Sequence, residues 1–483
     1  MSAHDIRSAE RPPFDTILRA MTDYVMDYDA STATLAMDTA RYCLMDSLAC
    51  ALMALDYPEC TKLLGPIVPG ASLPGGTRVP GTAHELDPVK AAWDIGCLVR
   101  FLDFNDTWLA AEWGHPSDNL GAILGIADWL SRKRVADGKA PLLMKDVLTA
   151  MIQAHEVQGV TALENAFNRV GLDHVMLVRI ASTAVAAKML GGSREEVLNA
   201  LSHAWVDGCS LRTYRHAPNT GSRKSWAAGD ASSRGVHLAL IALTGEMGYP
   251  SALSAKTWGF QDALFRGNEL KFSQGFGSYV MENILFKISF PAEFHAQTAV
   301  ECAMQLHPQV KDRIGEIERI EIETTDAGCR IIDKTGPMNN YADRDHCIQY
   351  MVAVPLIKGG LTAADYTDAG AADPRIDALR AITTVKENPR FSREYLEPEK
   401  RTIGNSVQVF FKDGSSAEKV SIDAPIGHRQ RRGEGIPVLV KKFESAIAAK
   451  LSPKKCATLN HLCADQSRFE AVPVQEFMGL FAV

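Results

Sequence analysis

Apolar residues recur at helical spacing through the first half of the chain. Leu44, Leu48 and Leu52 fall at intervals of four, which predicts an amphipathic helix that Thr32 or Thr34 could cap. Two more helix starts show cap signals, a proline after an aspartate and a capping-box pattern, at residues 87–88 and 193–196. The same spacing predicts further helices at about 118–133, 144–166, 174–190 and 227–244, and together these indicate a helical bundle.

The pattern changes after about residue 285. Residues 318–323 alternate between polar positions and isoleucine, which predicts a strand, and residues 406–422 have the pattern of a hairpin with an Asp413-Gly414 turn. Helical spacing returns at 343–358, 374–385 and 434–483. We therefore predict a mainly α fold with an α+β part. The expected domains are a helical domain over 1–284, an α+β domain over 285–428, and C-terminal helices over 429–483 that complete the helical domain.

Composition narrows the class of protein. Of 483 residues, 46% are hydrophobic and 23% charged, and the net charge of −7 argues against a nucleic-acid-binding protein, which needs a basic face. No run approaches the ~18 apolar residues of a membrane span, and the first residues lack the apolar core of a signal peptide. The ten cysteines are scattered without a C-x-x-C pair, which predicts reduced thiols in the cytoplasm and no zinc ribbon or local iron–sulfur cradle.

The densest group of reactive residues lies between 103 and 119. Asp103 and Thr107 are four positions apart, so they would share one face if the preceding helix extends this far. His115 lies between a glycine and a proline at a helix junction, where it could face a cleft and move a proton near neutral pH. The alternative is a polar turn between helices, in which Asp118 merely caps the next helix.

A second candidate is the basic segment, residues 208–229, which contains no acidic residue. Its cations and its histidine could cradle a polyanion such as a di- or tricarboxylate or a phosphate, and they are Arg212, Arg215, His216, Arg223 and Lys224. The alternatives are a solvated basic surface and a contact between subunits.

Two shorter segments carry further candidates. Lys287 and His295 lie where the helical half gives way to the mixed half, and domain junctions commonly hold ligands. Residues 343–346, Asp-Arg-Asp-His, have the pattern of an exposed helix start. No dinucleotide fingerprint, Walker loop or nucleophile elbow is present.

Three of these stretches resemble the MmgE/PrpD family: RFLDFNDTWLAAEWGHPSDN at 100–119, SLRTYRHAPNTG at 210–221 and DRDHCIQY at 343–350. The resemblance covers essentially the whole chain. It implies a large all-helical domain, a smaller α+β lid, a homodimer, and an active site in the cleft between body and lid. The implied activity is elimination of water from 2-methylcitrate to give cis-2-methylaconitate in the methylcitrate cycle of propionate breakdown, without metal or iron–sulfur cluster.

The resemblance also implies roles for individual residues. Asp103 and Thr107 match the family's Asp-x-x-x-Thr segment, and His115 matches its His-Pro histidine. As a hypothesis for the mechanism, His115 would transfer a proton, with Asp103 as its orienter or partner acid. His174 would be a second acid or base, and Tyr350 would close from the lid. Cations would hold the three carboxylates, and the substrate-binding set is Arg212, Lys224, Lys287 and His295.

Two other readings remain. A lyase of the same family could decarboxylate cis-aconitate instead, and the release of carbon dioxide would distinguish it. A non-catalytic helical binding protein predicts that the 103–119 segment and the basic segment lie on separate surfaces. Dehydration requires that they meet in one cavity.

Overall fold

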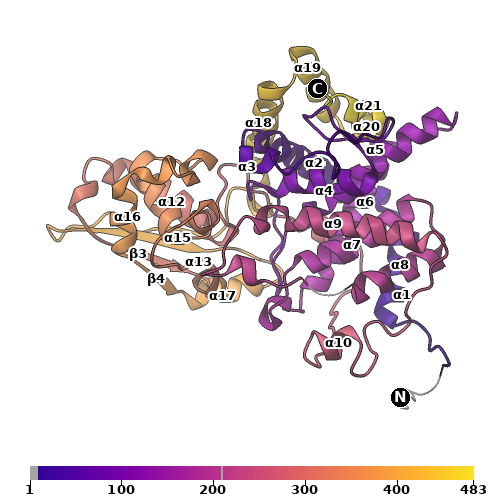
Figure 1. The fold of residues 1–483 in the computed structure, drawn as a ribbon. Coiled ribbons are helices and arrows are strands. Elements are labelled where there is room, and N and C mark those ends of the chain that lie inside the picture. Colours follow the sequence, from indigo (N-terminus) through magenta and orange to yellow (C-terminus); the bar gives the residue numbers. More distant parts are fainter. Residues whose placement is uncertain (1–8, 208–209) are drawn as a thin grey trace.

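Two hydrophobic cores organise the chain in the computed structural model, which describes residues 9–207 and 210–483. The larger core combines side chains of the first 288 residues with those of the C-terminal helices. The smaller core is built from residues between Phe290 and Ala417. Figure 1 shows the C-terminal helices, in yellow, beside α2, α4 and α5 and apart from the smaller orange part. We call the two parts the body and the lid; the boundaries at 284 and 428 remain a prediction.

Helices build the body, close to the bounds that periodicity indicates. The N-terminal set is α1 (Thr16–Asp27), α2 (Thr34–Ala54), α3 (Pro58–Thr61), α4 (Pro88–Arg100), α5 (Leu120–Ala136), α6 (Met144–Ala162), α7 (Val175–Met189), α8 (Arg194–Val206), α9 (Arg223–Ala242), α10 (Phe260–Ala263) and α11 (Tyr279–Asn283). The C-terminal set is α18 (Arg432–Lys450), α19 (Pro453–Cys463), α20 (Gln466–Glu470) and α21 (Val474–Gly479). The body also contains a two-residue ladder of β1 (Thr77–Arg78) and β2 (Glu85–Leu86), in and after a segment whose prolines and glycines break the helical pattern.

Helix caps agree with the sequence at two of three places. The Asp87 carboxylate accepts hydrogen bonds from the first turn of α4, and Ser193 forms a capping box with Glu196 at α8. The expected threonine cap of α2 is wrong, because Ala33 occupies the cap position and makes no side-chain bond.

Close packing of α4 against α9 positions the segments that form the candidate site. A Cβ atom added to Gly96 of α4 would lie 2.7 Å from the Cα atom of Gly229 of α9, so only glycine permits this approach. Since α4 ends at Arg100 and α9 begins at Arg223, their contact brings two segments that are distant in sequence to the same end of the body.

The lid is a four-stranded mixed sheet with helices. Its strand order is β4 (Thr383–Glu387), β3 (Ile317–Thr324), β5 (Asn405–Phe411) and β6 (Val420–Ile422); β3 and β4 are parallel and the other pairs are antiparallel. Helix α12 (Gln297–Val310) packs on β5, β6 and α15 (Ile348–Lys358). The other lid helices are α13 (Asp326–Ile332), α14 (Tyr341–Arg344), α16 (Pro374–Ala381) and α17 (Pro389–Leu396).

Sequence periodicity locates the lid strands better than it locates the lid helices. The hairpin at 406–422 is confirmed, with Val407 opposite Val420. The helix expected over 374–385 ends at Ala381, because the β-branched residues that follow pair with β3 as strand β4. The helix expected over 343–358 is interrupted between α14 and α15.

The described helices include none that combines the length and the apolar character needed to cross a bilayer.

Candidate active site

A cavity of about 20 Å³ lies where the body meets the lid. The body supplies most of its wall. Asp103, Trp113 and His115 come from the 103–119 segment, and Arg212, Arg215 and His216 from the basic segment. Arg100 and His174 complete this side. The lid supplies Glu293, Ile331 and His346. The 103–119 segment and the basic segment therefore share one cavity, which is the arrangement that the lyase reading requires.

Asp103 occupies a turn that directs its side chain into the cavity. Helix α4 ends at Arg100, so the expected stacking of Asp103 and Thr107 on one helical face is wrong. Asp103 has a φ of 50°, in the left-handed region that strains a side-chain-bearing residue and that is common at functional sites. Thr107 then pairs with Leu285 in an isolated bridge, which anchors the turn.

The Asp103 carboxylate is surrounded by buried cations. Its Oδ1 atom accepts a hydrogen bond from Lys287 Nζ and lies 2.7 Å from Arg100 Nη1. Burial alone would raise the pKa of Asp103, but Arg100 and Lys287 outweigh it and hold that pKa well below its usual range. Asp103 is therefore a fixed negative charge at neutral pH.

His115 is held as a neutral ring with one defined basic atom. Its Nδ1 atom lies 2.7 Å from the carbonyl oxygen of Asp106, which can only accept, so Nδ1 carries the hydrogen. Its Nε2 atom lies 3.0 Å from Arg100 Nη2, which can only donate, so Nε2 carries the lone pair. Burial, then Arg100 and Lys287, lower the pKa of His115 well below its usual range. Thr107 Oγ1 lies 3.2 Å from Nδ1 and confines the ring further.

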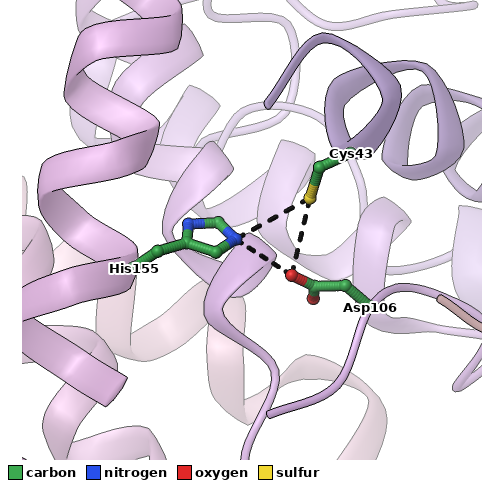
Figure 2. Close-up of side chains that lie close together, drawn as sticks. All are labelled: Cys43, Asp106 and His155. Carbon is green, nitrogen blue, oxygen red and sulfur yellow. Dashed lines mark hydrogen bonds and ion pairs between the residues drawn. The ribbon is translucent and has the colours of Figure 1, made fainter. Parts of the chain in front are cut away.

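A buried cluster behind His115 holds the carbonyl group that orients it. Figure 2 shows Cys43, Asp106 and His155 pointing toward one another from three segments of the body. His155 Nε2 lies 3.0 Å from Asp106 Oδ2, and the Cys43 Sγ atom lies 3.5 Å from the same oxygen. The backbone N–H of Ser117 donates to both carboxylate oxygens of Asp106. These contacts fix the Asp106 backbone, and hence the ring of His115.

The three side chains of this cluster could also ligate a metal ion. However, His155 Nδ1 lies 2.8 Å from the carbonyl oxygen of Met151, so Nδ1 donates and Nε2 faces the Asp106 carboxylate. His155 Nε2 and Asp106 Oδ2 lie 3.0 Å apart, within hydrogen-bond distance, so these atoms already have partners within the cluster.

His174 and Arg212 present unused hydrogen-bonding atoms at the cavity. His174 is buried just before α7, and among the described residues neither of its ring nitrogens has a hydrogen-bond partner. Arg212 Nη1 is also unpartnered and lies 3.7 Å from Glu112. Arg215 is bound instead to Asp173, in a buried ion pair that lowers the pKa of that carboxyl group. Buried, unpartnered groups of this kind are suited to a polar, anionic ligand.

The basic segment is therefore only partly a solvated surface. Arg212 and Arg215 are buried at the cavity, whereas Arg223 is exposed. Lys224 belongs to the first turn of α9, and its Nζ atom lies 2.5 Å from Asp345 Oδ2 of the lid. Residues 208 and 209 lie outside the described part of the chain.

Three of the expected site residues stand one layer behind the cavity wall. Lys287 is fully buried and bonds both the carboxylate and the carbonyl oxygen of Asp103. His295 Nδ1 lies 2.9 Å from the Glu293 carboxylate, which does line the cavity. The Tyr350 hydroxyl donates to the carbonyl oxygen of Asp365 in the lid core, and its ring stacks on another tyrosine. The structure does not bring these three side chains to the cavity itself, and Thr107 and Lys224 do not line it either.

Sequence reasoning missed four charged or titratable residues at or beside the cavity: Arg100, Glu293, Asp345 and His346. The expectation that residues 343–346 form an exposed helix start is wrong, because all four are buried. The signal for Asp345 and His346 is the 343–350 stretch itself, in which an aspartate and a histidine are adjacent.

A second group of possible metal ligands consists of Asp103 and His346, which line the cavity, and Asp345 beside them. Both carboxylates are already paired with cations of the body, Lys287 with Asp103 and Lys224 with Asp345. These cations repel a metal ion and favour an anionic ligand.

Comparison with known proteins supports a family assignment over both parts of the chain. The model of the MmgE/PrpD N-terminal domain matches residues 19–273, and that of the MmgE/PrpD C-terminal domain matches residues 290–466. The chain is 61% identical to a 2-methylcitrate dehydratase of Salmonella typhimurium and 60% identical to one of Escherichia coli, each over 98% of both chains. It is 56% identical to a mitochondrial 2-methylcitrate dehydratase of Yarrowia lipolytica, over 98% of this chain and 91% of that one. The chain belongs to the MmgE/PrpD family.

Proposed function

We propose that this protein is a hydro-lyase that removes water from 2-methylcitrate to give cis-2-methylaconitate in the methylcitrate cycle. The observation that carries the proposal is the cavity between body and lid, where buried cations and histidines from distant segments meet. Relatives that share about 60% of their residues along the whole chain are named for this reaction, which supports the same assignment. No observation favours decarboxylation of cis-aconitate.

Binding a tricarboxylate requires several positive charges in a confined space. Five buried cations lie at the cavity or directly behind it: Arg100, Arg212, Arg215, Lys224 and Lys287. Arg212 is the first carboxylate contact in this proposal, because its Nη1 atom is unpartnered and a guanidinium can bind a carboxylate through two hydrogen bonds. Lys224 and Lys287 act mainly by keeping Asp345 and Asp103 neutralised, so the acids do not repel the substrate.

Dehydration removes a weakly acidic C–H proton beside a carboxylate while hydroxide leaves the neighbouring carbon. We assign the C–H proton to His115, whose basic Nε2 atom is defined by the bond from Nδ1 to Asp106. Asp103 orients His115 through Arg100, which bonds both residues. A substrate carboxylate would draw Arg100 away from Nε2 and free the lone pair. His174 is the second candidate for acid–base work, since neither of its nitrogens makes a hydrogen bond among the described residues, and Nδ1 lies 3.3 Å from the Asp173 carboxylate.

In this proposal the two parts separate to admit the substrate. A cavity of about 20 Å³ holds about one water molecule, far less than a tricarboxylate. The lid therefore opens to admit the substrate and closes over it. Glu293 is placed for this closure by His295, and Tyr350 stiffens the lid core from which His346 projects.

We further propose that the protein works as a homodimer in the cytoplasm, without a metal or other cofactor. Free cysteines throughout the described residues are consistent with a reducing compartment. Sedimentation equilibrium would show a particle of twice the chain mass, whereas a single-chain mass would refute the dimer.

The function is tested by supplying 2-methylcitrate to enzyme treated with a chelator. Dehydration creates a conjugated alkene that absorbs in the ultraviolet, and we expect that absorbance to appear at an undiminished rate. Activity that returns only after iron is added would contradict the cofactor-free mechanism. Carbon dioxide released from cis-aconitate, with no alkene formed from 2-methylcitrate, would establish the decarboxylase instead.

A further inference from the structure

The lid places a histidine–aspartate pair at the cavity, and the roles assigned above leave it unused. His346 and Asp345 lie between α14 and α15, and both are buried. His346 Nδ1 lies 2.7 Å from Asp345 Oδ1, so the ring donates its hydrogen to that carboxylate. Its other nitrogen, Nε2, is then directed across the cavity toward the body and lies 3.9 Å from Asp103 Oδ2.

The position of His346 complements that of His115. The two histidines line the same cavity from opposite parts of the molecule, His115 from the body and His346 from the lid. His115 presents a lone pair at Nε2, because its Nδ1 hydrogen is held by the carbonyl oxygen of Asp106 and Nε2 faces the donor Arg100, so it is placed to accept a proton. An elimination needs a second group that donates a proton to the departing oxygen, and the body histidine in this state cannot do so.

We propose that His346 is a catalytic acid that protonates the leaving hydroxyl group, and that Asp345 is the positioning residue that orients it. This inference rests on the proposed dehydration. In the step, the base removes the C–H proton and the electron pair of that bond forms the C=C bond. The C–O bond breaks, and the hydroxide takes the Nε2 proton of His346 and leaves as water. Solvent then reprotonates His346 and deprotonates the base.

The charges that face His346 suit a group that alternates between its two states. Asp345 from its own segment, Asp103 from the turn after α4 and Glu293 from the segment before α12 all favour the protonated ring. Burial, and then Lys224 from α9 with its Nζ atom 3.2 Å from Nδ1, oppose protonation and together lower the pKa of His346 below its usual range. A bound tricarboxylate adds negative charge beside the ring and so promotes protonation when the substrate is present.

Lys224 also links this pair to lid closure. Its Nζ atom reaches from the body to Asp345 Oδ2 at 2.5 Å, so the carboxylate that orients His346 is itself fixed from across the interface. Opening the lid breaks this contact and withdraws His346 from the substrate. The acid is thereby in place only when water is excluded from the site.

The test compares His346→Gln with the unchanged enzyme and with His237→Gln, a control at an exposed histidine of α9. We expect His346→Gln to lower kcat by roughly 10²-fold or more, with a smaller change in KM. The alkaline limb of the kcat–pH profile, where the acid loses its proton, should disappear. In Asp345→Asn that limb should move to lower pH, because the carboxylate that stabilises the imidazolium is gone.

Each outcome decides the inference. A His346→Gln enzyme that keeps kcat within about threefold, or that keeps the alkaline limb, overturns the role of His346. If thermal melting shows that this variant does not fold, the pH profile of Asp345→Asn decides instead, and an unshifted limb overturns the inference. If the unchanged enzyme forms no alkene from 2-methylcitrate, it is the proposed function that fails.

Discussion

Replacing Asp103 by asparagine should cost the protein stability as well as activity. The carboxylate neutralises Arg100 and Lys287, whose side chains are 2% and 0% exposed. Removing one partner from a buried ion pair leaves an uncompensated charge, which costs about 3–5 kcal/mol in the free energy of unfolding. Asp23→Asn is the matched control. Asp23 pairs with Arg194 on the surface, where the two side chains are 60% and 48% exposed, so its loss should cost no more than about 1 kcal/mol.

Urea denaturation of both variants measures this difference, and its pH dependence tests the cause. Because the pKa of Asp103 is lowered in the folded state, its stabilisation is complete above the unfolded pKa of about 3.9 and is lost as the pH falls below that value. The gap between Asp103→Asn and the unchanged protein should therefore be constant from about pH 5 to pH 8 and shrink under acid conditions. Equal and small losses in the two variants would refute the view that Asp103 holds the buried cations.

Three further predictions concern the cavity. Arg212→Ala should raise KM at least about tenfold with a smaller change in kcat, as steady-state kinetics would show, because it removes from the wall a buried cation whose Nη1 atom makes no hydrogen bond; an unchanged KM would refute this role. His155→Gln should lower kcat roughly 10- to 100-fold at nearly constant KM, because it loosens Asp106 and so displaces His115, and wild-type turnover would show that the buried cluster does not position the base. The acidic limb of the kcat/KM–pH profile should lie below about pH 6.5, since the pKa of His115 is lowered; a limb above that value would assign the base to another group.

The helical body could be predicted from sequence because its signals are local. Apolar spacing and cap residues such as Asp87 and Ser193 determine where helices lie within a few residues. The end of α4 was missed because Phe101 and Leu102 continue the apolar character beyond Arg100, while the turn depends on the backbone conformation of Asp103. Strand β4 was missed because its formation depends on pairing with β3, more than 50 residues away.

The candidate site was predictable where its residues lie close together in sequence, as in the 103–119 and basic segments. It was not predictable across the interface. The run at 343–346 has the local charge pattern of an exposed helix start, and only its contact with Lys224, 121 residues distant from Asp345, makes it a buried part of the cavity. Lys287 was identified as a cation of the site, but its contact with Asp103 spans 184 residues, and that contact occupies it behind the cavity wall.

The central claim, that the cavity shared by body and lid is where 2-methylcitrate loses water, is tested most directly by the kcat of His115→Gln. The ultraviolet absorbance of the product gives the rate, and thermal melting checks that the variant is folded. We predict that kcat falls about 10²- to 10⁴-fold while the melting temperature changes little. A folded variant that forms cis-2-methylaconitate at the rate of the unchanged enzyme would contradict the account.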